Sequence, residues 1–187
     1  GIIAGFGTVQ IAANAVANNI DSMGCIPGQA ISLAMITVVG QCIGAGDYVQ
    51  AEYYTKKLMK ISYAFTSSIN AIIIFTLPLL LAIYSLSNDT LELARILIWI
   101  HAGCSIFLWP ASFTFPNALR AANDVKFTMI ASITSMWIFR IVTSYILGKS
   151  MGMGAIGVWI GMILDWIFRI FCFTFRYRSG KWKLHTI

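Results

Sequence analysis

The chain has 187 residues, of which 58% are hydrophobic and 11% are charged, whereas soluble domains have about 25% charged residues. Together with a mean hydropathy of +0.78, this composition argues against a water-soluble domain and indicates that lipid surrounds most of the chain. The net charge of +6 does not indicate nucleic-acid binding, because the lysines and arginines lie mainly between apolar runs and at the C-terminus.

Five apolar runs are long enough to cross a bilayer core, which requires about 20 apolar residues in a helix. They cover residues 9–44, 61–84, 93–116, 127–148 and 153–175, and residues 176–187 follow as a polar tail. We therefore predict an all-α fold, a polytopic membrane bundle with five transmembrane helices.

The first run, residues 9–44, is longer than a simple crossing requires. As a helix it would measure about 54 Å, against a hydrocarbon core of about 30 Å. Gly24, Pro27 and Gly28 lie inside it. The run therefore forms either one long helix bent near Pro27 or two half-helices.

The end of the first run, VVGQCIGAGD at residues 38–47, is rich in glycine. It contains neither a Walker loop nor a Rossmann turn, so nucleotide binding is not expected. Gly40 and Gly44 have the GxxxG spacing that lets two membrane helices approach closely. Gly46 and Asp47 suit a helix C-terminus followed by a turn.

Polar residues recur along one side of the first run. They are three or four positions apart and so share one face of a helix: Gln10, Asn14, Asn18, Asp21, Cys25 and Gln29. Polar residues are costly inside a membrane and mark functional positions. We expect Asn14, Asn18, Asp21 and Gln29 to line a substrate or ion pathway, with Asp21 facing a cationic substrate. The alternative is that the stripe packs on a neighbouring helix and its amides bond across the interface.

The third run contains two prolines and one histidine. Pro110 and Pro116 interrupt the run, and His101 suits either a proton relay or a buried hydrogen bond.

A charge cluster is expected between the last two runs. Arg140 and Asp165 lie at depths of about 20 Å and about 15 Å from the same membrane face, so we predict a structural clamp between them. Arg169, four residues after Asp165, can share the carboxylate from the same helix. The alternative is that the residues of this cluster bind substrate or transfer protons directly.

The charges outside the runs set the expected orientation. With the C-terminus in the cytoplasm, the inside segments hold Lys56, Lys57, Lys60, Arg120, Lys126, Arg176, Arg178, Lys181 and Lys183, and the outside segments hold only Arg95 and Lys149. This bias follows the positive-inside rule. It places Gly1 outside with an odd number of spans, and because no N-terminal signal is visible that would export this end, we expect a preceding span.

Several stretches resemble one transporter family. They are AANAVANNI with PGQAISLAMITVVGQCIGAGDYVQAE, then PNALRAANDVKFTM, SMWIFRI, GAIGVWIGMILDWIFR and RYRSGKW. In this order they are similar to the second half of multidrug and toxic compound extrusion (MATE) transporters. The resemblance implies that residues 1–187 are part of the C-terminal lobe, helices eight to twelve, of two six-helix bundles around a central cleft. It also favours one long bent helix for residues 9–44.

The resemblance implies a function as well. Members export organic cations and drugs across the plasma membrane in exchange for protons or sodium ions, by alternating access and without a bound cofactor. The implied partners are small organic cations, membrane lipids and the N-terminal lobe of the same polypeptide. Sodium-coupled members carry an acid about ten positions before the pair Leu119–Arg120, where this chain has Trp109. We therefore expect coupling through carboxylates of the other lobe rather than a sodium site here.

Other functions fit the sequence less well. A lipid-linked oligosaccharide flippase of the same superfamily would need more cationic residues in the cleft, and the stripe of the first run is neutral to acidic. Cys25, Cys42, Cys104 and Cys172 have no CxxC spacing and are interpreted as buried thiols. Without a nucleophile beside a base, or clustered metal ligands, neither an enzyme nor a metal site is expected.

Overall fold

The structure is a computed structural model that describes residues 2–184, and this part of the chain contains helices and no strand. The elements are η1 (Ile2–Phe6), α1 (Thr8–Gly44), α2 (Tyr48–Ala82), α3 (Asn88–Trp109), η2 (Pro110–Thr114), α4 (Pro116–Ala121), α5 (Val125–Ser135), η3 (Met136–Val142), α6 (Thr143–Tyr145), η4 (Ile146–Ser150), α7 (Gly154–Arg178) and η5 (Lys181–Leu184). Five helical segments are long and apolar enough to cross a membrane: Thr8–Gly44, Tyr48–Ala82, Asn88–Ala121, Val125–Ser150 and Gly154–Arg178. The predicted all-α bundle with five transmembrane helices is confirmed.

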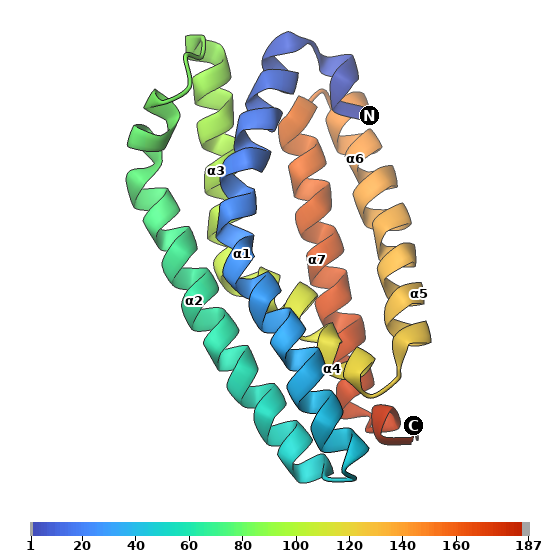
Figure 1. Cartoon of the computed structure of the whole chain (residues 1–187). Coiled ribbons are helices and arrows are strands. Elements are labelled where there is room, and N and C mark those ends of the chain that lie inside the picture. Colours follow the sequence, from blue (N-terminus) through green and yellow to red (C-terminus); the bar gives the residue numbers. More distant parts are fainter. Residues whose placement is uncertain (1, 185–187) are drawn as a thin grey trace.

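The five segments run up and down the length of the molecule (Figure 1). α1 packs against both α2 and α3, and α7 packs against α3 on one side and the α5–η4 segment on the other. One end of the bundle carries the N-terminus with the α2–α3 and α6–α7 turns (Figure 1). The opposite end carries the α1–α2 turn, the α4–α5 turn and the C-terminal end.

α1 is one continuous helix with Pro27 inside it, so the alternative of two half-helices is not what forms. Proline lacks a backbone donor, so in a helix the carbonyl four residues earlier, here that of Met23, loses its bond and the helix is weakened at that point. Neighbouring helices bond to carbonyls on both sides of Pro27. Asn70 of α2 donates to the Gly24 carbonyl oxygen at 3.3 Å, and Thr114 of η2 donates to the Gly28 carbonyl oxygen at 3.4 Å. These bonds hold the middle of α1 against its neighbours.

The third and fourth segments are not regular α-helices. Pro110 begins a π-helical turn, in which the Phe115 amide bonds to the Pro110 carbonyl at 2.9 Å, and Pro116 then begins α4. Two further π-helical stretches, η3 and η4, interrupt the fourth segment. π-helical turns inside α-helices occur frequently at functional sites.

The buried apolar residues form two large clusters at the two ends of the bundle and a small one between them. One end cluster joins α1, α2, α3 and α7 and includes Leu77 and Leu97. The other joins α1, α4 and α7 and includes Met35 and Leu119. Cys25, Trp109 and Trp166 form the small central cluster. The centre of the bundle is therefore where polar and aromatic side chains meet.

Large apolar side chains also cover the outside of the bundle. Phe75 of α2 is 85% exposed and Phe175 of α7 is 77% exposed. Exposed apolar surface of this kind is expected where helices face lipid.

Glycines allow α7 to lie directly on the end of the fourth segment. A Cβ atom at Gly157 would lie 2.6 Å from the Leu147 carbonyl carbon and 2.7 Å from the Gly148 nitrogen. Both are backbone atoms, which cannot rotate away. We expect Gly157→Ala to destabilise the protein by about 1–3 kcal/mol, the usual cost of overpacking.

Thermal unfolding in detergent measures this cost. Gly103→Ala in α3 is the matched control, because nothing lies within 4 Å of its Cβ position. Gly157→Ala should unfold several degrees below both the wild type and Gly103→Ala. Equal midpoints for the two variants would contradict the close packing of α7.

Candidate functional site

A cleft of about 580 Å³ opens in the middle of the bundle between α1, the α3–α4 region and α7. α1 supplies one wall that is mostly polar: Asn18, Asp21, Ser22, Cys25, Gln29, Ser32 and Leu33. The α3–α4 region and α7 supply His101, Trp109, Phe113, Asn117, Arg120, Met162 and Trp166, and η3 supplies Arg140. The cleft thus combines one carboxylate with several aromatic rings and two arginines.

Asp21 is buried in the wall of this cleft and lies next to a histidine. The residue is 4% exposed, and its Oδ1 lies 3.2 Å from Nδ1 of His101 in α3. This distance is that of an ion pair, but neither oxygen of Asp21 accepts a well-aligned hydrogen bond from any described residue. The His101 imidazole is thus the main polar contact of Asp21. The carboxylate oxygens of Asp21 can still accept hydrogen bonds from a group in the cleft.

Two tryptophans and a serine fix the position of His101. Its ring meets Trp159 and Trp166 of α7 edge to face, with centroid distances of 5.5 Å and 5.1 Å. Ser105, one turn later in α3, places its Oγ 3.4 Å from the same Nδ1. The imidazole is therefore confined between α7 and the Asp21 carboxylate.

Three aromatic rings of the cleft contact one another in a row. Trp109 stacks on Phe113 at 5.2 Å, and Phe113 meets Trp166 edge to face at 5.7 Å. Trp109 reaches α1 because residue 28 is glycine: a Cβ atom there would lie 2.1 Å from the indole ring. Electron-rich ring faces beside a carboxylate are suited to a flat organic cation.

The polar stripe of α1 divides between a cleft wall and a helix interface. Asn18, Asp21, Cys25 and Gln29 line the cleft. Gln10 and Asn14 instead bond to α7: Gln10 accepts from the Ala155 amide at 2.8 Å, and Asn14 accepts from Trp159 Nε1 at 2.9 Å.

The charge cluster differs from the predicted clamp. Asp165 is fully buried and pairs with Arg169 at 2.9 Å, and Ser135 of α5 donates to the same carboxylate oxygen. Arg140 does not reach Asp165; its Nη2 lies 3.7 Å from Met162 Sδ and the side chain lines the cleft. The Arg140–Asp165 bridge is therefore replaced by a pair within α7, because Arg169 one turn away already occupies the carboxylate.

Arg120 and Asn117 are cleft residues that the sequence patterns did not single out as such. They lie in α4, after the two prolines, and Arg120 Nη1 donates to Asn117 Oδ1 at 3.0 Å. The stripe of α1 alone suggested a neutral to acidic cleft. With Arg120 and Arg140 present, the cleft has a carboxylate in one wall and guanidinium groups in others.

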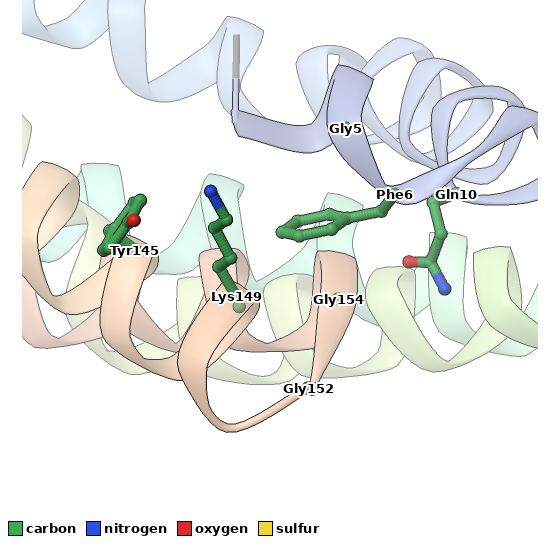
Figure 2. A pocket seen from close by; sticks show the side chains of 8 residues that line it. Gly5, Phe6, Gln10, Tyr145, Lys149, Gly152 and Gly154 are labelled. Atoms are coloured by element: carbon green, nitrogen blue, oxygen red, sulfur yellow. The ribbon is translucent and has the colours of Figure 1, made fainter.

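A second cavity of about 520 Å³ lies at the N-terminal end of the bundle, between η1, the start of α1 and the α6–α7 turn. Figure 2 shows Lys149 between Tyr145 and Phe6, with Gly152 and Gly154 forming the turn beneath. Lys149 Nζ lies 5.2 Å from the centre of the Tyr145 ring. Its lining holds a lysine and no carboxylate, so the central cleft is the better candidate for binding a cation.

Comparison with known proteins finds a matching family model and relatives that are named as multidrug resistance proteins or transporters. The MatE family model matches residues 1–146. The probable multidrug resistance protein NorM of Thermotoga maritima is 26% identical over 181 residues, which is 97% of this chain and 39% of that protein. NorM of Idiomarina loihiensis is 31% identical over 170 residues, 87% of this chain and 36% of that protein.

A third relative is the uncharacterized transporter YisQ of Bacillus subtilis, which is 28% identical over 184 residues, 96% of this chain and 39% of that protein. The chain therefore spans somewhat less than two fifths of the length of the curated relatives that it matches.

Proposed function

Because the chain belongs to the MatE family, we propose that it forms part of one lobe of a secondary active antiporter that exports organic cations or drugs. The relatives named for multidrug resistance support this proposal. The single observation that carries it is the buried Asp21 carboxylate, which lines a cleft together with stacked aromatic rings. Such a site attracts a flat cation by charge and by its rings.

In this proposal the central cleft of the lobe faces the N-terminal lobe of the full-length protein, and cargo passes between the two by alternating access. Asn18, Asp21 and Gln29 face the passage, and Asn14 braces α1 on α7 through Trp159. The counter-ion is a proton or a sodium ion, and no cofactor or enzymatic reaction is involved.

The protein is proposed to lie in the plasma membrane with its C-terminus in the cytoplasm. The end of the bundle with the α1–α2 turn, the α4–α5 turn and the C-terminal end carries most of the lysines and arginines outside the spans. This distribution supports a cytoplasmic location for that end.

Arg120 and Arg140 support a second candidate function. A flippase for a lipid-linked oligosaccharide needs cationic groups for the pyrophosphate, and these two arginines line the cleft. Asp21 opposes this reading, since an unneutralised carboxylate in the same cleft repels an anionic headgroup.

Uptake of ethidium into inverted membrane vesicles that contain the full-length protein tests the proposal. We expect accumulation driven by an imposed proton or sodium gradient, and competition by tetraphenylphosphonium. Failure to accumulate any organic cation under either gradient, together with transfer of a pyrophosphate-linked lipid between leaflets in a flipping assay, would replace the antiporter with the flippase.

A further inference from the structure

A groove of about 370 Å³ lies between α2, the η2–α4 junction and the C-terminal part of α7, and we call it the basic groove. It shares no lining residue with the central cleft. Phe115 lines the basic groove, whereas Phe113 and Asn117, each two positions away, line the cleft. Residues two apart point to opposite sides of a helix. The basic groove therefore opens on the other face of this segment, away from the cleft.

Three of the apolar runs have an end beside the basic groove. The runs 61–84, 93–116 and 153–175 begin or end directly next to lining residues, namely Lys60, Phe115 and Thr174. An apolar run ends where the hydrocarbon core of the membrane meets the headgroup layer. The basic groove therefore crosses that boundary, with its two lysines on the headgroup side and Tyr63 on the hydrocarbon side.

The two lysines of the groove have no partner of opposite charge. Lys56 and Lys60 are one turn apart on α2, so they share one face of the helix, and both are exposed. Neither forms an ion pair with a described residue. Glu52, one turn before Lys56, pairs instead with Lys183 of η5 at 2.5 Å. Both ammonium groups are therefore available to an anion from outside the protein.

The hydrocarbon side of the groove is mainly apolar and aromatic, and contacts between helices hold it in place. Tyr63 donates to the Phe107 carbonyl oxygen at 3.1 Å, which fixes its ring against α3. The rings of Phe115 and Tyr177 contact each other, with centroids 5.1 Å apart. The buried Thr55 hydroxyl donates within α2 at 2.8 Å. The surface next to the lysines is therefore formed before any ligand arrives.

We propose that the basic groove binds one anionic phospholipid, with the phosphate between Lys56 and Lys60 and an acyl chain along Tyr63 and Phe115. The inference requires that the five segments cross a bilayer, but it does not rest on the transport of cations. Lysine stems lie along apolar surface while their ammonium groups reach the headgroup layer. Basic pockets between transmembrane helices bind anionic headgroups in this way.

The two halves of the groove together select the class of lipid. Phosphatidylglycerol has a net negative charge, so its phosphate is available to both ammonium groups. Phosphatidylcholine has the same phosphate and chains, but its own quaternary ammonium cancels the charge and competes with the lysines. Free inorganic phosphate has the charge but no chain for the apolar half. An anionic phospholipid is therefore the ligand that uses the whole groove.

Binding of phosphatidylglycerol to the purified full-length protein in neutral detergent tests the proposal, with native mass spectrometry counting the lipids that stay bound. We expect a saturable site for phosphatidylglycerol and weaker retention of phosphatidylcholine with the same acyl chains. A lysine beside an anionic lipid contributes about fivefold in affinity, so Lys56→Gln combined with Lys60→Gln should weaken the site by about 10- to 30-fold. Lys56→Arg combined with Lys60→Arg keeps both charges and should retain the site.

The matched control is Lys57→Gln combined with Lys126→Gln. Both lysines are exposed at the same end of the bundle (Figure 1), and neither lines the basic groove. This control removes the same charge and should keep the wild-type affinity. Equal affinity in the wild type and in Lys56→Gln with Lys60→Gln, or an equal loss in the control, would overturn the proposal.

A change in the apolar half tests the contact with the acyl chain. Ala111→Phe fills the groove and leaves both lysines in place, so it should also weaken binding of phosphatidylglycerol. Unchanged binding in a folded Ala111→Phe would overturn the proposed path of the chain. If this variant unfolds, the lysine variants still decide.

Two other occupants of the groove would be recognised in the same measurements. Inorganic phosphate should not displace phosphatidylglycerol, because it has no chain. Complete displacement by millimolar phosphate would assign the groove to the free ion and overturn the lipid site. A dimer that Ala111→Phe dissociates, whether or not phosphatidylglycerol is present, would assign the groove to a second copy of the protein and overturn it as well.

Discussion

Asp21→Asn is expected to bind monovalent organic cations about 10- to 100-fold more weakly than the wild type and to transport them correspondingly poorly. The change keeps the size of the side chain and removes the only negative charge among the residues that line the central cleft. A hydrogen bond or ion pair to a buried charge is worth about 1.5–3 kcal/mol, so affinity should fall by about 10- to 100-fold. Tetraphenylphosphonium binding and ethidium uptake at matched expression measure the effect.

The control for this variant is Asp89→Asn. Asp89 lies in the first turn of α3, at the end of the bundle and outside the cleft lining. It should transport at the wild-type rate. Wild-type rates in both Asp21→Asn and Asp21→Ala would remove Asp21 from the mechanism.

Asp165→Asn is expected to destabilise the protein more than Gly157→Ala does. It leaves the guanidinium of Arg169, whose side chain is 12% exposed, without its carboxylate inside the lobe. Removing one partner of a buried ion pair costs about 3–5 kcal/mol, mainly because the other charge is left uncompensated. Thermal unfolding of the full-length protein in detergent should show a large loss.

Two further variants identify the cause of that loss. Asp165→Asn combined with Arg169→Gln removes both charges, so it should recover much of the stability. Arg140→Gln should change stability little, because Arg140 contacts Met162 and not Asp165. A loss with Arg140→Gln as large as with Asp165→Asn would restore the clamp that the sequence suggested.

The number of spans could be predicted from the sequence, because apolar runs of membrane length leave few alternatives to a helix. The ends of the helices could not be predicted from hydropathy. α2 begins at Tyr48, well before the apolar run at residues 61–84, since Asp47 caps it by accepting from the Gln50 amide at 2.9 Å. Polar residues continue a helix outside the apolar run as readily as apolar ones. The π-helical stretches of the fourth segment likewise have no hydrophobic signal.

The candidate site was only partly predictable for a related reason. The spacing of α1 identified Asn18, Asp21 and Gln29, because periodicity reports which residues share a face. Periodicity does not report which helix covers that face. The sequence therefore could not show that Asn14 bonds to Trp159 while other residues of the same face line the cleft. The partner of Asp21 could have been found by comparing depths, because His101 lies equally far along a helix that starts at the same end of the bundle. This comparison requires the first residue of each helix, which hydropathy does not locate correctly.

The hydroxyl and amide bonds around Pro27 have a mechanical consequence. Asn70 and Thr114 attach to α1 on the two sides of the proline, and Ser32 and Ser62 join Thr114 at 3.2 Å and 3.0 Å. A helix can bend at a proline when no neighbour bonds to the carbonyls around it. Hydrogen bonds from neighbouring helices on both sides of the proline restrict this bending. In the rocking motion proposed for transport, α1, α2 and the α3–α4 segment are then expected to move as one rigid unit, so that a displacement at the α1–α2 turn also moves the opposite end of the bundle.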